Sequence, residues 1–141
     1  MVKDVILSRP LRAGLVCVPN PKRRIAGGPL YAVDDVLEAL AAQTLRVVTR
    51  KAMRDVQELS LDNDELAQLI RRAVQYGRYK NSEWCETGRT QTATSWAACD
   101  AYTVSRDERN ETAGKSFTCE YYLKFAIGKT ELVLLVVSCH L

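Results

Sequence analysis

Two apolar strands in succession near the C-terminal end place the strongest limit on how this chain can fold. Residues 120–127 alternate with a period of two, with apolar side chains at the odd positions and Glu120, Tyr122 and Lys124 on the other face. A short turn at 128–130 leads into 132–140, an almost continuous apolar run that ends at His140, the single histidine of the chain. The two segments predict an antiparallel hairpin.

The length of this turn decides where His140 points. A three-residue turn places His140 opposite Thr118 and Cys119 opposite Cys139, and it puts His140 on the same face as Tyr122 and Lys124. A two-residue turn would send His140 to the other face. An imidazole, a phenol and an ammonium on one rigid face supply what phosphodiester cleavage without a metal requires.

The first half of the chain predicts helices that pack as a scaffold. Apolar residues recur with a helical period over 33–42. Thr49 is the expected N-cap of a helix over 50–59, and Asp62 or Asn63 is the expected N-cap of another over 64–76. Gly77 ends the last helix, and residues 45–48 form a short extended segment.

The second half of the chain predicts strands separated by polar connections. Strands are expected over 95–105, 116–127 and 131–140, with a loop over 79–93 and a solvated, charged connection over 106–111. Helices followed by strands predict an α+β fold in which an antiparallel sheet packs against N-terminal helices.

Length and composition indicate one folded domain. The chain has 141 residues, 47% hydrophobic and 26% charged, which allows a core without disulfides or metals. Residues 1–29 are broken by Pro and Gly, so we expect an N-terminal arm, or a strand with a mobile loop, before a domain over 30–141. The net charge of +3 is small, but basic residues gather at 22–24, as a solvated loop or an auxiliary phosphate contact, and over 71–80.

Targeting segments and metal sites are not expected. The longest aliphatic run, 132–137, is far shorter than the roughly 20 residues needed to span a bilayer. The five cysteines lack close metal-ligand spacing, so a zinc site built from Cys85, Cys99, Cys119 and His140 is the weaker alternative to reduced thiols in a cytoplasmic protein. We therefore expect no metal, no cofactor and no membrane partner.

Several short segments occur in an order that resembles a known family. They are VLEAL (36–40), LRVVTRKA (45–52), ELSLD (58–62), YK (79–80), Trp96, YLK (122–124) and VVS (136–138). Together they resemble the MqsR family of bacterial toxins over roughly residues 33–141, about three quarters of the chain. The resemblance implies a RelE-like α+β fold, a metal-independent ribonuclease that cuts messenger RNA, and a cognate antitoxin protein that neutralises it and can bind DNA.

The resemblance also implies which residues act. The family's loop lysine matches Lys80, and its strand tyrosine matches Tyr122, with Lys124 two residues on. Its lysine near the C-terminus falls on His140, which is a change of residue type.

The chain departs from the family pattern at other positions. The family's glutamine after the tryptophan is replaced by Ala97, and Asp100 or Gln91 are the candidates for its role. Residues 1–29 and the longer segment 103–116 lie outside the usual pattern. The competing function is therefore a non-catalytic binding or inhibitor protein with the same fold, for instance one from a mobile element that acts on a host complex.

The chemistry of RNA cleavage suits the matched residues. The ribose 2′-hydroxyl attacks the phosphorus and leaves a 2′,3′-cyclic phosphate and a 5′-hydroxyl, which requires an acid, a base and cations. His140 can serve as acid or base, Tyr122 can donate a proton or position the phosphate, and Lys80 and Lys124 can stabilise negative charge. The simpler interpretations are a solvated terminal histidine, a packing tyrosine and surface lysines.

Three further residues are candidates for RNA binding. Tyr79 or Trp84 could stack an unpaired base, because every base offers a π-face. Arg78 belongs to the basic region before them. Aromatic residues such as Trp84 and Trp96 are more often core or rim residues than base platforms. The expected substrate is single-stranded messenger RNA.

Overall fold

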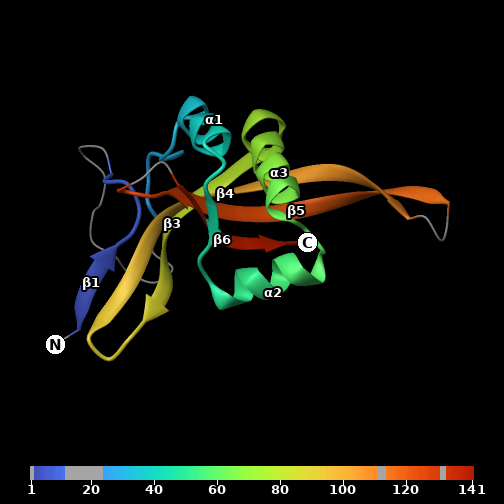
Figure 1. Ribbon diagram of the computed structural model, residues 1–141. Helices are drawn as coiled ribbons and strands as arrows, with labels where there is room; N and C mark the ends of the chain where they lie inside the picture. Colours follow the sequence, from blue (N-terminus) through green and yellow to red (C-terminus); the bar gives the residue numbers. More distant parts are fainter. Residues whose placement is uncertain (1, 12–23, 111–113, 131–132) are drawn as a thin grey trace.

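The fold is α+β, and the residues that the structure describes form three helices and a curled, mixed six-stranded sheet (Figure 1). A computed structural model describes residues 2–11, 24–110, 114–130 and 133–141. The elements in these ranges are β1 (Lys3–Ile6), α1 (Val33–Ala41), β2 (Leu45–Val47), α2 (Arg50–Glu58), α3 (Asn63–Tyr76), β3 (Arg78–Arg89), β4 (Ala93–Asn110), β5 (Lys115–Ile127) and β6 (Leu134–His140). None of the helices described combines the length and apolar character that crossing a membrane requires.

Helices α2 and α3 begin where the sequence predicts, because polar side chains satisfy their first backbone N–H groups. The Thr49 hydroxyl accepts a hydrogen bond from Ala52 N at 3.1 Å at the start of α2. Asp62 and Glu65 form a reciprocal capping box at the start of α3, with Glu65 N donating to Asp62 at 2.7 Å. Gly77 is the C-cap of α3, so the predicted end is confirmed.

The sheet is mixed, so the expected antiparallel sheet is wrong in this respect. The strand order is β1-β4-β5-β6-β2, with β3 on the other edge of β4. β1 runs parallel to β4 and β2 runs parallel to β6, while the other pairs are antiparallel. Each parallel pair joins strands far apart in the sequence, so no tight hairpin forces the antiparallel direction.

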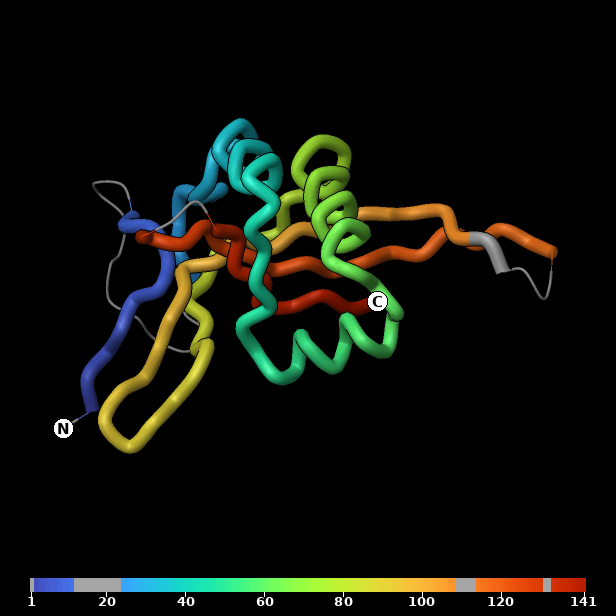
Figure 2. Tube along the Cα trace, viewed as in Figure 1, coloured from blue at the N-terminus to red at the C-terminus, as the bar shows by residue number. Residues whose placement is uncertain are grey.

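Two segments predicted as connections are strands instead. Residues 79–93 were expected to form a loop, but β3 occupies most of this range, with Ser82 and Trp84 buried on one face and polar side chains on the other. The charged segment after residue 105 continues β4, and it pairs with β5 in a two-stranded ribbon that extends beyond the helices (Figure 2). Its charges are tolerated because they pair along the ribbon, as in the ion pair of Arg106 with Glu108.

The described part of residues 1–29 belongs to the same sheet as the rest of the chain. β1 pairs with the start of β4, and Ile25 N donates to Ser82 O of β3 at 2.8 Å. Residues 24–31 then cross to α1, held by Asp100. This buried carboxylate accepts hydrogen bonds from Leu30 N at 2.9 Å and Tyr31 N at 3.1 Å.

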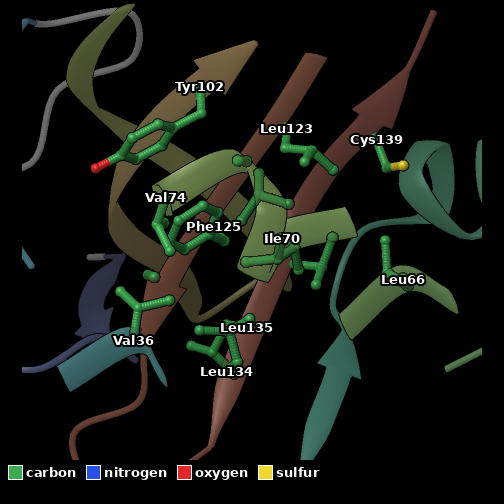
Figure 3. Packing of buried hydrophobic residues seen from close by; sticks show 14 of the residues in the cluster. Val36, Leu66, Ile70, Val74, Tyr102, Leu123, Phe125, Leu134, Leu135 and Cys139 are labelled. Carbon is green, nitrogen blue, oxygen red and sulfur yellow. The ribbon is translucent and has the colours of Figure 1, made fainter. Parts of the chain in front are cut away.

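The main core lies between α1, α3 and one face of β4, β5 and β6 (Figure 3). Leu123 and Phe125 of β5 and Cys139 of β6 point into this layer, opposite Val36 of α1 and Ile70 of α3. Because side chains alternate along a strand, the even-numbered residues Tyr122 and Lys124 lie on the other face. We call this second face the site face.

Candidate functional site

The β5–β6 hairpin places His140 directly opposite Tyr122. The predicted pairing with Thr118 is therefore wrong by four residues. The strands first pair at Ile127 and Leu134, so the connection is longer than three residues, and a bulge after Lys124 adds a further shift. The shift is four residues at His140, an even number that keeps this side chain on its predicted face. It is three residues at Leu134–Val136, whose side chains therefore lie on the opposite face from the one predicted.

The same shift changes the environment of two cysteines. Cys139 pairs with Leu123 in the core, whereas Cys119 pairs with Arg106 in the ribbon. The expected opposition of Cys119 and Cys139 is therefore wrong.

The rings of His140 and Tyr122 stack on the site face. Their centroids lie 5.0 Å apart, and their planes differ by 21°. The imidazole Nδ1 lies 3.1 Å from the carbonyl oxygen of Leu141. His140 also borders a small hollow of about 170 Å³ together with Asp55 and Glu58 of α2. The histidine is thus held against the sheet while one side of its surroundings stays accessible.

Lys124 stands beside this pair as a fixed positive charge. Its ammonium lies 5.7 Å from the centre of the Tyr122 ring and forms an ion pair with Glu83 of β3, which also contacts Arg24 at 3.5 Å. Burial alone would lower the pKa of Lys124, but the hydrogen bond to Glu83, helped by the nearby Cys85 thiol, raises it above its usual range. Lys124 can therefore stabilise negative charge but does not exchange a proton near neutral pH.

Strand register assembles the site face into rows that cross the sheet. One row runs Arg78–Thr103–Tyr122–His140, each residue paired with the next on the neighbouring strand. Paired residues in antiparallel strands project to the same face. Four strands thus present a guanidinium, a hydroxyl, a phenol and an imidazole in line.

A hollow of about 350 Å³ opens at the Arg78 end of this row. Its lining includes three cationic side chains, two hydroxyl residues and one carboxylate: Arg72, Arg78, Lys80, Thr103, Ser105 and Glu120. We call it the cationic hollow. Arg72 is anchored there because its Nε donates to Ser105 O at 2.8 Å, on the edge of β4 that β3 leaves unpaired.

The cationic hollow exists because α3 ends very close to β4. A Cβ on Gly77 would lie 2.4 Å from Thr103 O and 2.6 Å from Ala73 O, both backbone atoms. Only glycine lets the chain turn from α3 into β3 at this distance. Lys80 follows at a bulge in β3 and lines the hollow with an exposed side chain.

Two residues expected to stack RNA bases are occupied elsewhere. Trp84 is only 3% exposed and packs with Trp96 and Ile25 in a second core cluster, so its predicted role as a base platform is wrong. The Tyr79 ring packs edge-on against Tyr102, with centroids 5.7 Å apart, and its hydroxyl contacts Ser82 at 2.7 Å. Tyr79 therefore contributes to packing rather than to an open stacking surface.

Neither substitute for the absent glutamine lies in the site. Asp100 is fully buried and bound to Leu30, Tyr31 and Ser82. Gln91 lies between β3 and β4, at the end of these strands remote from Arg78.

The sequence gives no signal for Glu83 as a neighbour of the site, because Glu83 meets Lys124 across 41 positions of the sequence. Arg72 belongs to the basic region over 71–80, but its contact with Ser105, across 33 positions, was not predicted. Of the basic triplet at 22–24, only Arg24 lies within the described residues.

The described thiols do not form a metal site. No group of three or more His, Cys, Asp or Glu that could hold a metal ion occurs among the described residues, and Cys17 lies outside them. The adjoining Cys99 thiol lowers the pKa of Cys85, an effect that burial opposes and the Lys124 charge supports. The site face itself presents the His140 imidazole, the Tyr122 phenol and the Lys124 ammonium paired with the Glu83 carboxylate.

No protein-family model matches this chain, and comparisons with curated proteins and with solved structures find no similar one.

Proposed function

We propose that this protein is a metal-independent endoribonuclease that cleaves single-stranded messenger RNA, with a RelE-like toxin fold. The observation that carries the proposal is the row Arg78–Thr103–Tyr122–His140, in which the stacked imidazole and phenol lie in line with a cationic hollow. A group that can transfer protons thus stands beside a surface suited to an anionic backbone.

Each side chain of the row has a role that fits its surroundings. His140 transfers a proton at the reacting phosphate, and the stacked Tyr122 orients the imidazole and donates its hydroxyl to a phosphate oxygen. Lys80 and Arg78 are exposed and hold the backbone of the RNA. Lys124, which is paired with Glu83, contributes a fixed electrostatic field at the site rather than a direct contact with the RNA.

The toxin part of the proposal rests on the resemblance of the sequence to the MqsR family. A RelE-like toxin acts in the cytoplasm and needs an antitoxin protein as its partner. The ion pair of Lys124 with Glu83 favours a second candidate, a non-catalytic binding protein of the same fold, because it withdraws one of the candidate catalytic cations from the substrate.

Two substitutions separate the enzyme from the binding protein. If His140 transfers a proton, His140→Ala lowers the cleavage rate of a labelled single-stranded RNA by about 10²-fold or more and leaves RNA affinity nearly unchanged. Lys80→Ala weakens binding and lowers the slope of log affinity against log salt by about one, because it removes one phosphate contact. Equal cleavage by wild type and His140→Ala would refute the assignment of His140.

A further inference from the structure

Among the described residues, Glu120 is the one carboxylate that lines the cationic hollow, and it has no role in the proposal so far. It lies on β5 two residues before Tyr122, on the same face, and it pairs with Ser105 of β4. Two residues along a strand span roughly 6.6 Å, so Glu120 and Tyr122 are neighbours on this face.

Glu120 and His140 flank Tyr122 from two different directions. Glu120 is displaced along β5, toward the hollow, whereas His140 lies across the gap between β5 and β6. Diagonal neighbours of this kind have Cα atoms about 7–8 Å apart. A phosphate seated over Tyr122 would have the carboxylate on one side and the imidazole on the other.

The charges around the two groups differ in sign. Glu120 shares its hollow with Arg72 from α3 and with Arg78 and Lys80 from β3. His140 shares the other hollow with Asp55 and Glu58 from α2.

We propose that the cationic hollow binds the phosphodiester next to the reacting bond and that Glu120 is the general base of the cleavage, with His140 as the general acid. This inference rests on the proposed ribonuclease function and divides the proton transfers between two residues. A carboxylate oxygen can accept the proton of a hydroxyl group that lies within hydrogen-bond reach.

The step balances with these two residues alone. The Glu120 carboxylate takes the proton of the ribose 2′-hydroxyl as the 2′-oxygen forms its bond to phosphorus. The bond from phosphorus to the 5′-oxygen breaks, and the His140 imidazolium gives that oxygen a proton. The products are a 2′,3′-cyclic phosphate and a 5′-hydroxyl, while Arg78 and Lys80 neutralise the charge that builds on the non-bridging oxygens.

Glu120→Gln distinguishes a base from a mere surface charge because the two roles predict opposite effects. If Glu120 is the base, the cleavage rate of a labelled single-stranded RNA falls by about 10²-fold or more, although RNA binding is unchanged or tighter. The rate–pH profile also loses the limb on which the wild-type rate falls in acid. If Glu120 only opposes the phosphate charge, the rate stays the same or rises.

Matched variants test the location of the site. Glu38→Gln changes an exposed carboxylate of α1 and should alter neither rate nor affinity. Arg78→Gln should weaken RNA binding and reduce the salt slope by about one, whereas Arg71→Gln should not, because Arg71 lines a different hollow beside α1.

The two levels of the proposal fail in different ways. A Glu120→Gln variant that cuts RNA as fast as the wild type would overturn the role of Glu120 and leave the proposed ribonuclease function intact. Equal effects of Arg71→Gln and Arg78→Gln would overturn the hollow as the phosphate site. Wild-type protein that leaves the RNA uncut would overturn the proposed function and this inference together.

Discussion

Asp100 holds residues 24–31 against the sheet, and its replacement should destabilise the whole fold. Its carboxylate is fully buried. Leu30 N donates to its two oxygens at 2.9 and 3.0 Å, Tyr31 N donates to one at 3.1 Å, and the Ser82 hydroxyl donates to the other at 2.6 Å. These bonds join the segment before α1 to β3 and β4.

The magnitude follows from what each variant leaves unpaired. Asp100→Ala leaves the Leu30 and Tyr31 N–H groups without an acceptor, each costing about 1–3 kcal/mol, while the Ser82 hydroxyl keeps its contact with Tyr79, so we expect a total loss of about 2–6 kcal/mol. Asp100→Asn can still accept both N–H groups on one oxygen and donate to Ser82 through its amide. It loses mainly the charge assistance of the bonds, about 1–2 kcal/mol.

Urea unfolding followed by tryptophan fluorescence measures both losses, because Trp84 and Trp96 lie in the cluster beside this segment. Glu38→Ala, at an exposed position of α1, serves as the control. A loss below about 1 kcal/mol for Asp100→Ala, or a larger loss for Asn than for Ala, would refute the assignment of these hydrogen bonds.

Two further substitutions test packing and protonation. Gly77→Ala should lower the free energy of unfolding by about 1–3 kcal/mol in the same assay, because its Cβ would meet backbone oxygens at 2.4 and 2.6 Å. The control Gly88→Ala, whose Cβ would have no atom within 4 Å, should be nearly neutral. A Gly77→Ala variant as stable as the wild type would contradict the close approach of α3 to β4. Tyr121→Phe should cost about 1 kcal/mol near neutral pH because it removes the hydrogen bond to Glu108. Burial, together with that bond, raises the pKa of Tyr121 from 10.0 to about 12, so the protonated phenol stabilises the fold below pH 10 and this contribution disappears as the pH rises from 10 to 12. The stability difference between wild type and Tyr121→Phe should therefore narrow over that range, and a constant difference would contradict the shift.

Local chemistry made the helices and the central hairpin predictable. Caps such as Thr49 and Asp62 act within three or four residues, so the sequence alone locates them. The face of Tyr122 was also predictable, because side chains alternate along a strand whatever the register of its partner. The register itself was not, because the bulge after Lys124 depends on how β6 meets its neighbours.

The rest of the site depends on contacts distant in the sequence. The sequence of β3 predicts a polar loop because only one face of the strand is buried. Contacts with β4 and with segment 24–31 keep it in the sheet. The same packing removes Trp84 from the surface. The ion pair that occupies Lys124 comes from Glu83, which has no local signal that it faces a lysine on another strand.

Cleavage of RNA in the absence of metal tests the central claim most directly. Purified wild-type protein and His140→Ala are incubated with an end-labelled single-stranded RNA in excess EDTA, and the product ends are identified. We expect the wild type to cut the RNA and leave 2′,3′-cyclic phosphate and 5′-hydroxyl ends, at a rate about 10²-fold or more above that of His140→Ala. Intact RNA with the wild-type protein, or cleavage that returns only when magnesium or zinc is added, would contradict a ribonuclease that works through its own side chains.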